Sequence, residues 1–226
     1  MKQRILGASI MIEVRSVTFS YGECPVLTDV SFAVHRGDFA VLRGESGSGK
    51  STLLRLMCKL ETPTTGCVFY EGIPYDEIPP RLLRRKAALL QQSPVMVEET
   101  VRDNLLLSFR FARSKMKSIE DRELRALLTR ARLDHALLLK HAGELSMGQK
   151  QRIAFLRLLL MDPEVFLLDE PVSGLDEEST DALIGWLVEL NTLGKTVFLV
   201  SHTASGLIPP GARLFRLENG HVMEEK

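Results

Sequence analysis

The chain has 226 residues, of which 45% are hydrophobic and 26% are charged, and its 29 Lys and Arg balance its 29 Asp and Glu. The apolar fraction is too high for an intrinsically disordered chain, and the zero net charge gives no general attraction to nucleic acids or anionic membranes. A chain of this length buries roughly seven-tenths of its surface on folding, which predicts one domain with room for a subdomain.

The cysteines and the apolar runs predict a cytoplasmic protein that does not span a membrane. Cys24, Cys58 and Cys67 are odd in number and show no C-x-x-C spacing, which predicts a reduced, cytoplasmic protein. The apolar runs are shorter than the roughly 18 residues that a membrane-spanning helix needs. Met1–Met11 holds a short apolar patch without a convincing cleavage site, so we expect no signal peptide and a natural start at Met1 or Met11.

Short apolar or alternating runs predict strands, and longer runs with helical periodicity predict helices. In chain order the predicted strands are Ile12–Thr18, Val26–Val34, Phe39–Arg43, Val68–Tyr70, Ala87–Gln91, Val165–Leu168, Thr196–Val200 and Leu214–Leu217. The predicted helices are Lys50–Leu60, Thr100–Phe109, Ile119–Arg132, Met147–Met161 and Glu177–Leu193. Helix caps are predicted at Thr100 and Ser118, and Asn219-Gly220 predicts a hairpin turn.

The order of these elements predicts the fold class. Strands dominate the beginning of the chain, and strands and helices then alternate. A mostly helical stretch, approximately 95–160, is inserted before the sheet resumes. We therefore expect a single α/β domain over 1–226, with a mixed sheet, an antiparallel β subdomain and an inserted helical subdomain.

The clearest motif lies between the third predicted strand and the first predicted helix. Gly44-Glu45-Ser46-Gly47-Ser48-Gly49-Lys50-Ser51 matches G-x-x-x-x-G-K-S/T in the context that this motif requires. The glycines allow the backbone N–H groups to turn inward, and the following helix presents its N-terminus to phosphates. Lys50 can reach the β- and γ-phosphates, and the Ser51 hydroxyl can hold Mg²⁺. The motif predicts a P-loop nucleoside triphosphatase core.

Two carboxylates follow a buried strand later in the chain. The run Val165–Leu168 is apolar and is followed directly by Asp169 and Glu170. Open α/β sheets place their ligands at the carboxyl ends of such strands. We expect Asp169 to bind the metal ion and Glu170 to act as the base that deprotonates water. Taken alone, such a pair is more often a solvent-exposed strand end, but the preceding phosphate loop favours the metal and catalytic roles.

The third motif is Leu145-Ser146-Met147-Gly148-Gln149, at the start of the helix that runs to Met161. Ser146 and Gln149 have the spacing of a capping box. A capping box does not explain Gly148, which is unfavourable in a helical turn by up to about 1 kcal/mol. A glycine there indicates close approach to the backbone, as by an anion at the helix N-terminus.

These three motifs together resemble the ATP-binding subunits of ABC transporters, and the resemblance extends along nearly the whole chain. The segment Leu145–Gln149 resembles the family signature, usually L-S-G-G-Q, from which Met147 departs. The resemblance implies ATP and Mg²⁺ as cofactors. It assigns nucleotide contacts to Tyr21, Gly44, Glu45, Ser46, Gly47, Ser48, Gly49, Lys50, Ser51, Thr52, Ser146, Gly148, Gln149 and Asp176.

The resemblance also implies roles for residues that spacing alone does not single out. Tyr21 matches the aromatic residue that stacks on adenine, and His202 matches the histidine that contacts the γ-phosphate. Gln92 matches the glutamine that contacts Mg²⁺ and water, although Gln91 beside it leaves the register open. The catalytic residues would be Glu170, His202 and Gln92, and the metal ligands Ser51, Gln92 and Asp169. The segment 173–176 resembles the loop that contacts the opposite subunit.

The family's mode of action implies partners for the chain. The active form would be a head-to-tail homodimer with two ATP molecules at the interface, on the cytoplasmic face of the plasma membrane, bound to membrane-spanning permease subunits and not to nucleic acid. Lys50 and Ser51 of one chain would meet Ser146 and Gly148 of the other. The alternatives are a soluble ABC ATPase of iron–sulfur cluster assembly, and a P-loop small-molecule kinase, which leaves Leu145–Gln149 unexplained.

The zero net charge conceals two oppositely charged segments. Residues 81–132 hold 13 Lys and Arg against 6 Asp and Glu, and residues 162–226 hold 4 against 12. The acidic segment includes Asp169, Glu170 and Asp176. The basic segment covers the region after Gln92 and the helical subdomain, where the resemblance implies docking of the membrane partner. Its cations would therefore face a permease or anionic lipid head groups, or form a solvated helical face. These cations are Arg84, Arg85, Lys86, Arg110, Arg113, Lys115 and Lys117.

Overall fold

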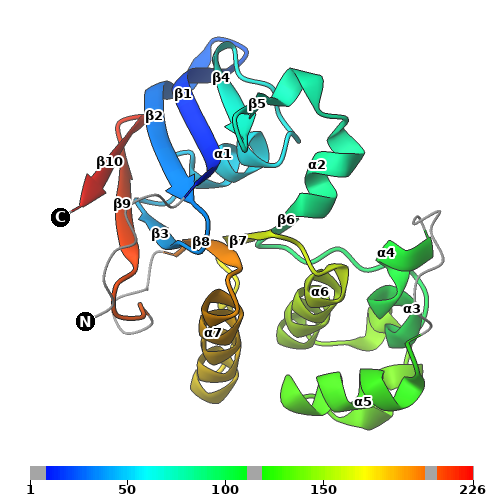
Figure 1. The fold of residues 1–226 in the computed structure, drawn as a ribbon. Helices are drawn as coiled ribbons and strands as arrows, with labels where there is room; N and C mark the ends of the chain where they lie inside the picture. The colour runs from blue at the N-terminus through cyan, green and yellow to red at the C-terminus, as the bar shows by residue number, and fades with distance from the viewer. Residues whose placement is uncertain (1–8, 111–118, 202–207, 226) are drawn as a thin grey trace.

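The computed structural model describes residues 9–110, 119–201 and 208–225 (Figure 1). An antiparallel sheet has the order β2 (Cys24–His35), β1 (Ile10–Tyr21), β4 (Thr65–Tyr70), β5 (Ile73–Pro74). A second sheet has the order β10 (His221–Glu225), β9 (Arg213–Glu218), β3 (Phe39–Arg43), β8 (Thr196–Val200), β7 (Val165–Asp169), β6 (Ala87–Leu90). All neighbours in the second sheet are parallel except β9 and β10.

The helices differ widely in length. They are α1 (Lys50–Met57), α2 (Pro80–Lys86), α3 (Val101–Leu105), α4 (Leu107–Arg110), α5 (Asp121–Arg130), α6 (Met147–Met161) and α7 (Glu177–Thr192). Short 3₁₀ turns cover Tyr75–Glu77, His135–Leu139 and Ala142–Glu144. None of the helices in the described part of the chain combines the length and apolarity that crossing a bilayer needs.

The parallel strands are buried on both faces, which explains their continuous apolar runs. In β3, Phe39 and Val41 point into one hydrophobic core, and Ala40 and Leu42 point into another. The first core packs the sheet against α3, α5, α6 and α7, and the second packs it against α1 and the antiparallel sheet. The molecule therefore has three layers, with the six-stranded sheet in the middle (Figure 1).

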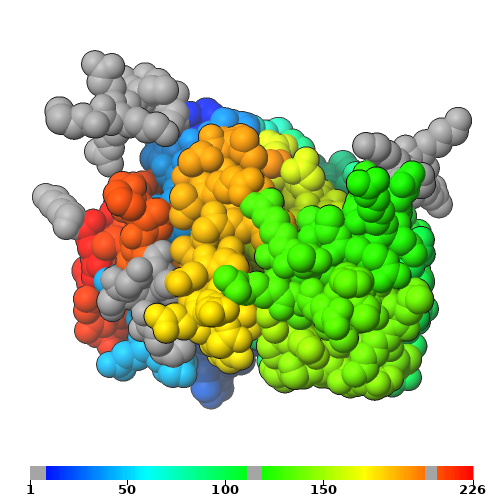
Figure 2. All heavy atoms as spheres, turned by 90° about the horizontal axis from the view of Figure 1, so that it is seen from below, coloured from blue at the N-terminus to red at the C-terminus, as the bar shows by residue number. Residues whose placement is uncertain are grey.

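The helices between β6 and β7 form a distinct region. Seen from below, the green residues of α3 to α5 occupy one side of the molecule, and the orange to red strands β9 and β10 occupy the other (Figure 2). Helix α6 lies between α7 and α5 (Figure 1). The insertion of this helical region within an α/β framework confirms the predicted fold class. Its boundaries as a subdomain stay a prediction.

Most predicted elements are present, with shifted ends. Helix α6 has the predicted bounds, and the Thr100 hydroxyl caps α3 by accepting a bond from the Asp103 N–H at 3.2 Å. The helix predicted over Thr100–Phe109 is interrupted at Leu106, between α3 and α4. Ser118 lies outside the described residues, and Glu120 is the residue that precedes α5. Helix α2 was not predicted, because Leu83 is its single buried residue and it shows no periodicity.

Candidate functional site

The phosphate loop connects β3 to α1. Helix α1 begins after Gly49, whose φ of 105° lies in the left-handed region and which provides no side-chain cap. A Cβ at Gly49 would lie 2.8 Å from Val26 Cγ1, so only glycine fits. The first N–H groups of α1 point toward the loop, as does the positive end of the helix dipole. They remain available to a ligand because no side chain caps this end. This arrangement suits an anion.

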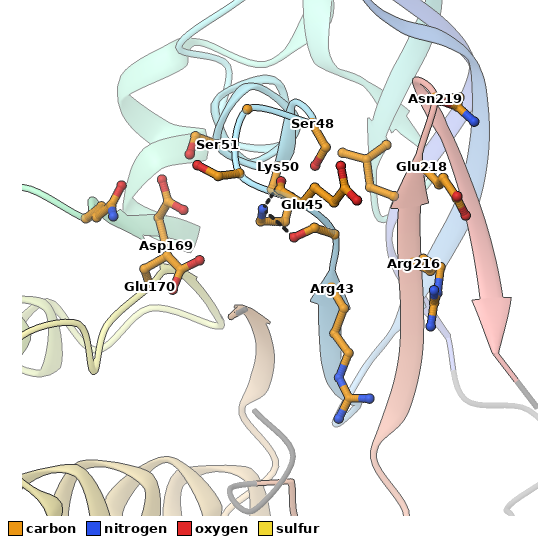
Figure 3. A pocket seen from close by; sticks show the side chains of 15 residues that line it. Arg43, Glu45, Ser48, Lys50, Ser51, Asp169, Glu170, Arg216, Glu218 and Asn219 are labelled. Atoms are coloured by element: carbon orange, nitrogen blue, oxygen red, sulfur yellow. Dashed lines mark hydrogen bonds between the residues drawn. The ribbon is translucent and has the colours of Figure 1, made fainter. Parts of the chain in front are cut away.

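Lys50 lies inside the loop that precedes it. Its side chain is mostly buried, and its Nζ donates to the carbonyl oxygens of Gly44 at 2.9 Å and Glu45 at 2.7 Å. Both acceptors belong to the loop itself, so the lysine is held above the start of α1 (Figure 3). A phosphate at this position would exchange neutral acceptors for a charged one, which gives a stronger bond.

A cleft of about 800 Å³ opens over the loop. The strands β3, β6, β7 and β9 supply its walls through their last residues or the segments that follow them, as expected for a ligand site at the carboxyl ends of a parallel sheet. Of the residues predicted from sequence, Gly44, Glu45, Ser46, Gly47, Ser48, Lys50, Ser51, Gln92, Asp169 and Glu170 line this cleft. Asp169 and Glu170 face the loop from the side of β7 (Figure 3).

Asp169 has the environment of a metal ligand. It is 7% exposed, and its Oδ1 has no hydrogen-bond partner among the described residues. Burial raises the pKa of the Asp169 carboxyl, and a hydrogen bond from Ser51 opposes that rise. A buried carboxylate oxygen without a partner is unfavourable unless a ligand satisfies it. Together with the Ser51 hydroxyl and the Gln92 amide, it offers the oxygen ligands that Mg²⁺ prefers.

Glu170 is held in an unusual backbone conformation. Its φ is 50°, and its N–H donates to the Val200 carbonyl at 3.0 Å on the neighbouring strand. A non-glycine residue in the left-handed region is strained, and such strain is concentrated at functional sites. The side chain is also 7% exposed and points into the cleft beside Asp169 (Figure 3). Its position suits a base that acts on water beside a phosphate.

Two consecutive glutamines follow β6 and point in different directions. Gln92 lines the phosphate cleft, whereas Gln91 lines a separate groove of about 210 Å³ between the segment after β6 and helix α6. This geometry favours Gln92 as the residue that meets the nucleotide. It also places the groove one residue away from the cleft.

The signature segment lies at the start of α6 and is not among the residues that line the cleft. The Ser146 hydroxyl accepts from the Gln149 N–H at 3.2 Å, and the Ser146 N–H donates to Gln149 Oε1 at 3.0 Å, which is the predicted capping box. Met147 is 63% exposed. A Cβ at Gly148 would lie 3.2 Å from the Gly174 carbonyl oxygen, so a contact within the chain also accounts for this glycine.

The remaining predicted residues that the structure describes are not among those that line the cleft. Asp176 caps α7 by accepting from the Ser179 N–H at 2.7 Å, and this bond lowers the pKa of its carboxyl. Tyr21 ends β1, is 46% exposed and packs edge-on against Phe19. Thr52 is buried in the first turn of α1. His202 lies outside the described residues.

Sequence reasoning did not identify the opposite wall of the cleft. Arg43, Arg216, Glu218 and Asn219 also line it, and Arg43 is paired in register with Arg216 across β3 and β9. Arg43 directly precedes the phosphate loop, so its proximity was detectable. The contribution of β9 depends on a strand pairing between residues more than 170 positions apart, which no local pattern predicts.

Much of the basic segment is engaged within the chain. Arg84 donates to the Lys59 carbonyl at 2.6 Å, Lys86 lies 3.4 Å from Glu164, and Arg110 lies 2.6 Å from Glu99. Arg113, Lys115 and Lys117 lie outside the described residues. Of the cations proposed to face a membrane partner, Arg84, Lys86 and Arg110 thus have partners within the chain.

Comparison with known proteins identifies the family. The family model described as ABC transporter matches residues 27–173, more than half of the chain. The chain is 41% identical to Protein STAR1 of Oryza sativa subsp. japonica over 88% of its length, and 37% identical to the methionine import ATP-binding protein MetN 2 of Rhodopseudomonas palustris over 96%. It is 36% identical over 99% of its length to the Nod factor export ATP-binding protein I of Rhizobium meliloti.

The chain spans 57%, 59% and 67% of the lengths of these three relatives. Among solved structures, a dimeric ATP-binding cassette in a post-hydrolysis state with bound ADP and Pi matches with a TM-score of 0.84 and 32% identity, covering 96% of this chain and 98% of that one. The motifs, the three-layer fold and these matches agree. The chain belongs to the ABC transporter family and has the fold of an ATP-binding cassette.

Proposed function

We propose that the chain binds Mg·ATP in its cleft, hydrolyses it within a head-to-tail homodimer, and thereby powers transport by separate membrane-spanning subunits. The observation that carries the proposal is the cleft itself. It joins an uncapped helix N-terminus and a buried lysine to two buried carboxylates at the carboxyl end of β7. The first pair suits a triphosphate, and the second suits a metal ion and an attacking water.

Each group in the cleft has a distinct chemical task. The N–H groups of the loop and Lys50 would bind the β- and γ-phosphates, and Ser51, Gln92 and Asp169 would hold Mg²⁺, which neutralises phosphate charge. Glu170 would orient a water molecule and accept its proton. Phosphoryl transfer to water depends on positioning and charge stabilisation, so no covalent nucleophile is required.

A second copy is proposed because one chain leaves the site incomplete. Ser146 and Gly148 would contact the γ-phosphate, yet they are not among the residues lining their own chain's cleft. A twofold dimer presents the α6 N-terminus of each chain to the cleft of the other, so one contact surface completes two sites. A structural relative at 32% identity is itself described as dimeric.

The groove beside Gln91 is the proposed docking site for a membrane-spanning subunit. It is lined by apolar residues of β6 and α6, and Val95 at its edge is 66% exposed. Arg157 of α6 donates to the Val95 carbonyl at 2.9 Å and holds this segment against the helix. A cytoplasmic helix of the permease in this groove would move Gln91 and hence its neighbour Gln92. The relatives include an import and an export subunit, so the proposal concerns the energy-coupling step that both directions share.

The catalytic half of the proposal is tested with Glu170→Gln. The amide keeps the shape of the side chain but cannot take a proton, so ATP binding should persist while turnover falls about 10²–10⁴-fold. Steady-state ATPase assays measure the loss, and light scattering should show an ATP-dependent dimer. Glu77→Gln, an identical change at an exposed site outside the cleft, is the control. Near-normal turnover of Glu170→Gln would contradict the assignment.

The transport half is tested by purifying the Glu170→Gln chain from detergent-solubilised membranes. A co-purifying subunit with several apolar spans is the expected result, and Val95→Asp should abolish its recovery. Leu193→Asp introduces the same charge at another exposed apolar residue, on the C-cap of α7, and should leave recovery unchanged. Recovery of iron–sulfur assembly proteins in place of a membrane subunit would support the alternative function.

A further inference from the structure

Arg152, on the second turn of α6, connects three separate segments of the chain. Its Nε donates to the Gly148 carbonyl at 3.2 Å, within the signature turn. Its Nη1 donates to the Ser179 hydroxyl at 2.9 Å, on the first turn of α7, and to the Arg132 carbonyl at 3.0 Å, just after α5. A planar guanidinium with fixed donors can address several acceptors at once.

The acceptors belong to segments assigned to the dimer surface. Gly148 lies in the signature turn, and Ser179 is bonded through its N–H to Asp176, the last residue of loop 173–176. Arg152 thus contacts the signature turn directly, and it reaches the loop through one intermediate residue, Ser179. Ser179 is 3% exposed, so water competes little for the bond between them.

The signature turn and loop 173–176 also contact each other directly. A Cβ added at Gly148 would lie 3.2 Å from the Gly174 oxygen and 3.4 Å from Leu175 Cδ2, so the two backbones approach closely at this point. This contact is not directional, and it does not fix the relative orientation of the two segments. The hydrogen bonds of Arg152 supply that direction.

We propose that Arg152 is a positioning residue that holds the signature turn and loop 173–176 in one fixed arrangement, so that both are presented together to a second copy of the chain. The inference rests on the proposed head-to-tail dimer. In a twofold dimer each chain offers the signature to its partner's ATP and the loop to the partner's surface. If the signature turn and the loop were misaligned with each other, the two contacts could not form at the same time.

A second arginine, Arg130, also connects the helical region to α7 but does not contact the signature turn or loop 173–176. It therefore separates the positioning role of Arg152 from a general attachment of the helical region. Arg130 joins the same helical region to α7, but further along the helix: its guanidinium lies 4.0 Å above the Trp186 ring and pairs with Glu189. Both of these contacts lie on α7, away from the signature turn and from loop 173–176. Removing Arg130 loosens α5 from α7 and leaves the Arg152 bonds in place, so Arg130→Met is a matched control for Arg152→Met.

The main experiment measures ATP-dependent dimerisation in the Glu170→Gln background. Arg152→Met should raise the protein concentration needed for dimerisation at least tenfold, with monomer ATP affinity within twofold of the parent, and Arg130→Met should dimerise like the parent. In chains with Glu170 intact, Arg152→Met should lower kcat at least tenfold with little change in KM. Arg152→Lys retains the charge without the fork of donors, and should restore dimerisation only in part.

A second readout uses the monomer and does not depend on the dimer. Amide hydrogen exchange over 173–179 should be faster in Arg152→Met and in Arg152→Lys than in Arg130→Met. If Glu170→Gln itself fails to dimerise with ATP, the proposed function is wrong, and the exchange data alone decide the inference. Unchanged exchange over 173–179, normal dimerisation of Arg152→Met, or an equal defect in Arg130→Met would each overturn it.

Discussion

The two helix N-termini proposed to meet one ATP molecule differ in how their backbone donors are used. Helix α1 begins at a left-handed glycine that provides no cap, beside a lysine bonded only to its own loop. Helix α6 begins with a complete capping box between Ser146 and Gln149. The first N-terminus offers its donors to an anion in a single chain. The second uses two of its donors, the N–H groups of Ser146 and Gln149, within its own cap.

This difference predicts an order of events. Nucleotide binding should depend on α1 alone, because its N–H groups need no rearrangement. The Ser146 hydroxyl accepts from the Gln149 N–H, so its own proton stays available to donate to a phosphate of the partner's site once the two chains meet. Ser146 is exposed, so this donation exchanges a hydrogen bond to water for one to phosphate. Such an exchange has a small net free energy, so closure should remain reversible. The predictions below test this contrast.

Among the variants that test this contrast, Lys50→Ala should have the largest effect, because it removes the charged donor beside α1. A hydrogen bond to a charged group contributes about 1.5–3 kcal/mol, so monomer affinity for ATP should fall roughly 10- to 150-fold. Titration with a fluorescent ATP analogue measures the loss. Folding stability should change little, because the released Gly44 and Glu45 carbonyls face the cleft. Unaltered affinity would refute the role of α1.

Ser146→Ala should show the opposite pattern. Losing an N-cap hydroxyl destabilises a protein by about 0.5–2 kcal/mol, and urea unfolding should show this loss. Monomer ATP affinity should stay within twofold of the parent, while ATP-dependent dimerisation weakens. A fall in monomer affinity comparable to that of Lys50→Ala would show that both N-termini serve the same chain's nucleotide, which contradicts the head-to-tail arrangement.

Features that depend on neighbours in sequence could be predicted, whereas features that depend on distant segments could not. The loop Gly44–Ser51 and the capping box at Ser146 are local patterns, and helix α6 was predicted with its observed bounds. Local patterns are read correctly when neighbours in sequence supply all the partners. The cap at Thr100 was predicted for the same reason.

Contacts between distant segments were not predictable. Arg216 enters the cleft through the pairing of β9 with β3, and Arg152 finds its acceptors on α7 and after α5. Gly148 shows the effect on interpretation. The sequence indicates a close approach to its backbone and suggests an anion, whereas the approach of Gly174 is a second reason that only the tertiary structure contains.

Two carboxylates also differ in whether the chain itself satisfies them. Asp176 has its hydrogen bond from Ser179, whereas Asp169 is buried with Oδ1 unsatisfied. Asp169→Asn removes that buried charge and should stabilise the free chain by about 1 kcal/mol, or roughly 2–4 °C in Tm, while weakening Mg²⁺-dependent ATP binding. Thermal unfolding without nucleotide measures the first effect. A destabilised variant would show that the carboxylate is satisfied in the free protein.

The pH dependence of this gain follows from the raised pKa of Asp169. A raised pKa means that the folded chain takes up a proton more readily than the unfolded chain. The burial penalty is therefore fully present above the folded pKa and disappears as pH falls to the unfolded value. The advantage of Asp169→Asn should be largest near neutral pH and should vanish in acid. Asp76→Asn, at an exposed aspartate outside the cleft, is the control and should give no such trend.

The smallest effect on stability is expected for Gly148→Ala, and its sign separates the two reasons for this glycine. Alanine is favoured over glycine in a helix by about 1 kcal/mol, but its Cβ would press on the Gly174 oxygen at 3.2 Å. We expect the two terms to cancel to within about 1 kcal/mol in urea unfolding. We also expect ATP-dependent dimerisation to weaken, because the methyl group is added within the turn proposed to contact the partner's γ-phosphate. A loss of stability above about 2 kcal/mol with normal dimerisation would assign the glycine to packing within the chain. A stable variant that fails to dimerise would assign it to the partner's nucleotide.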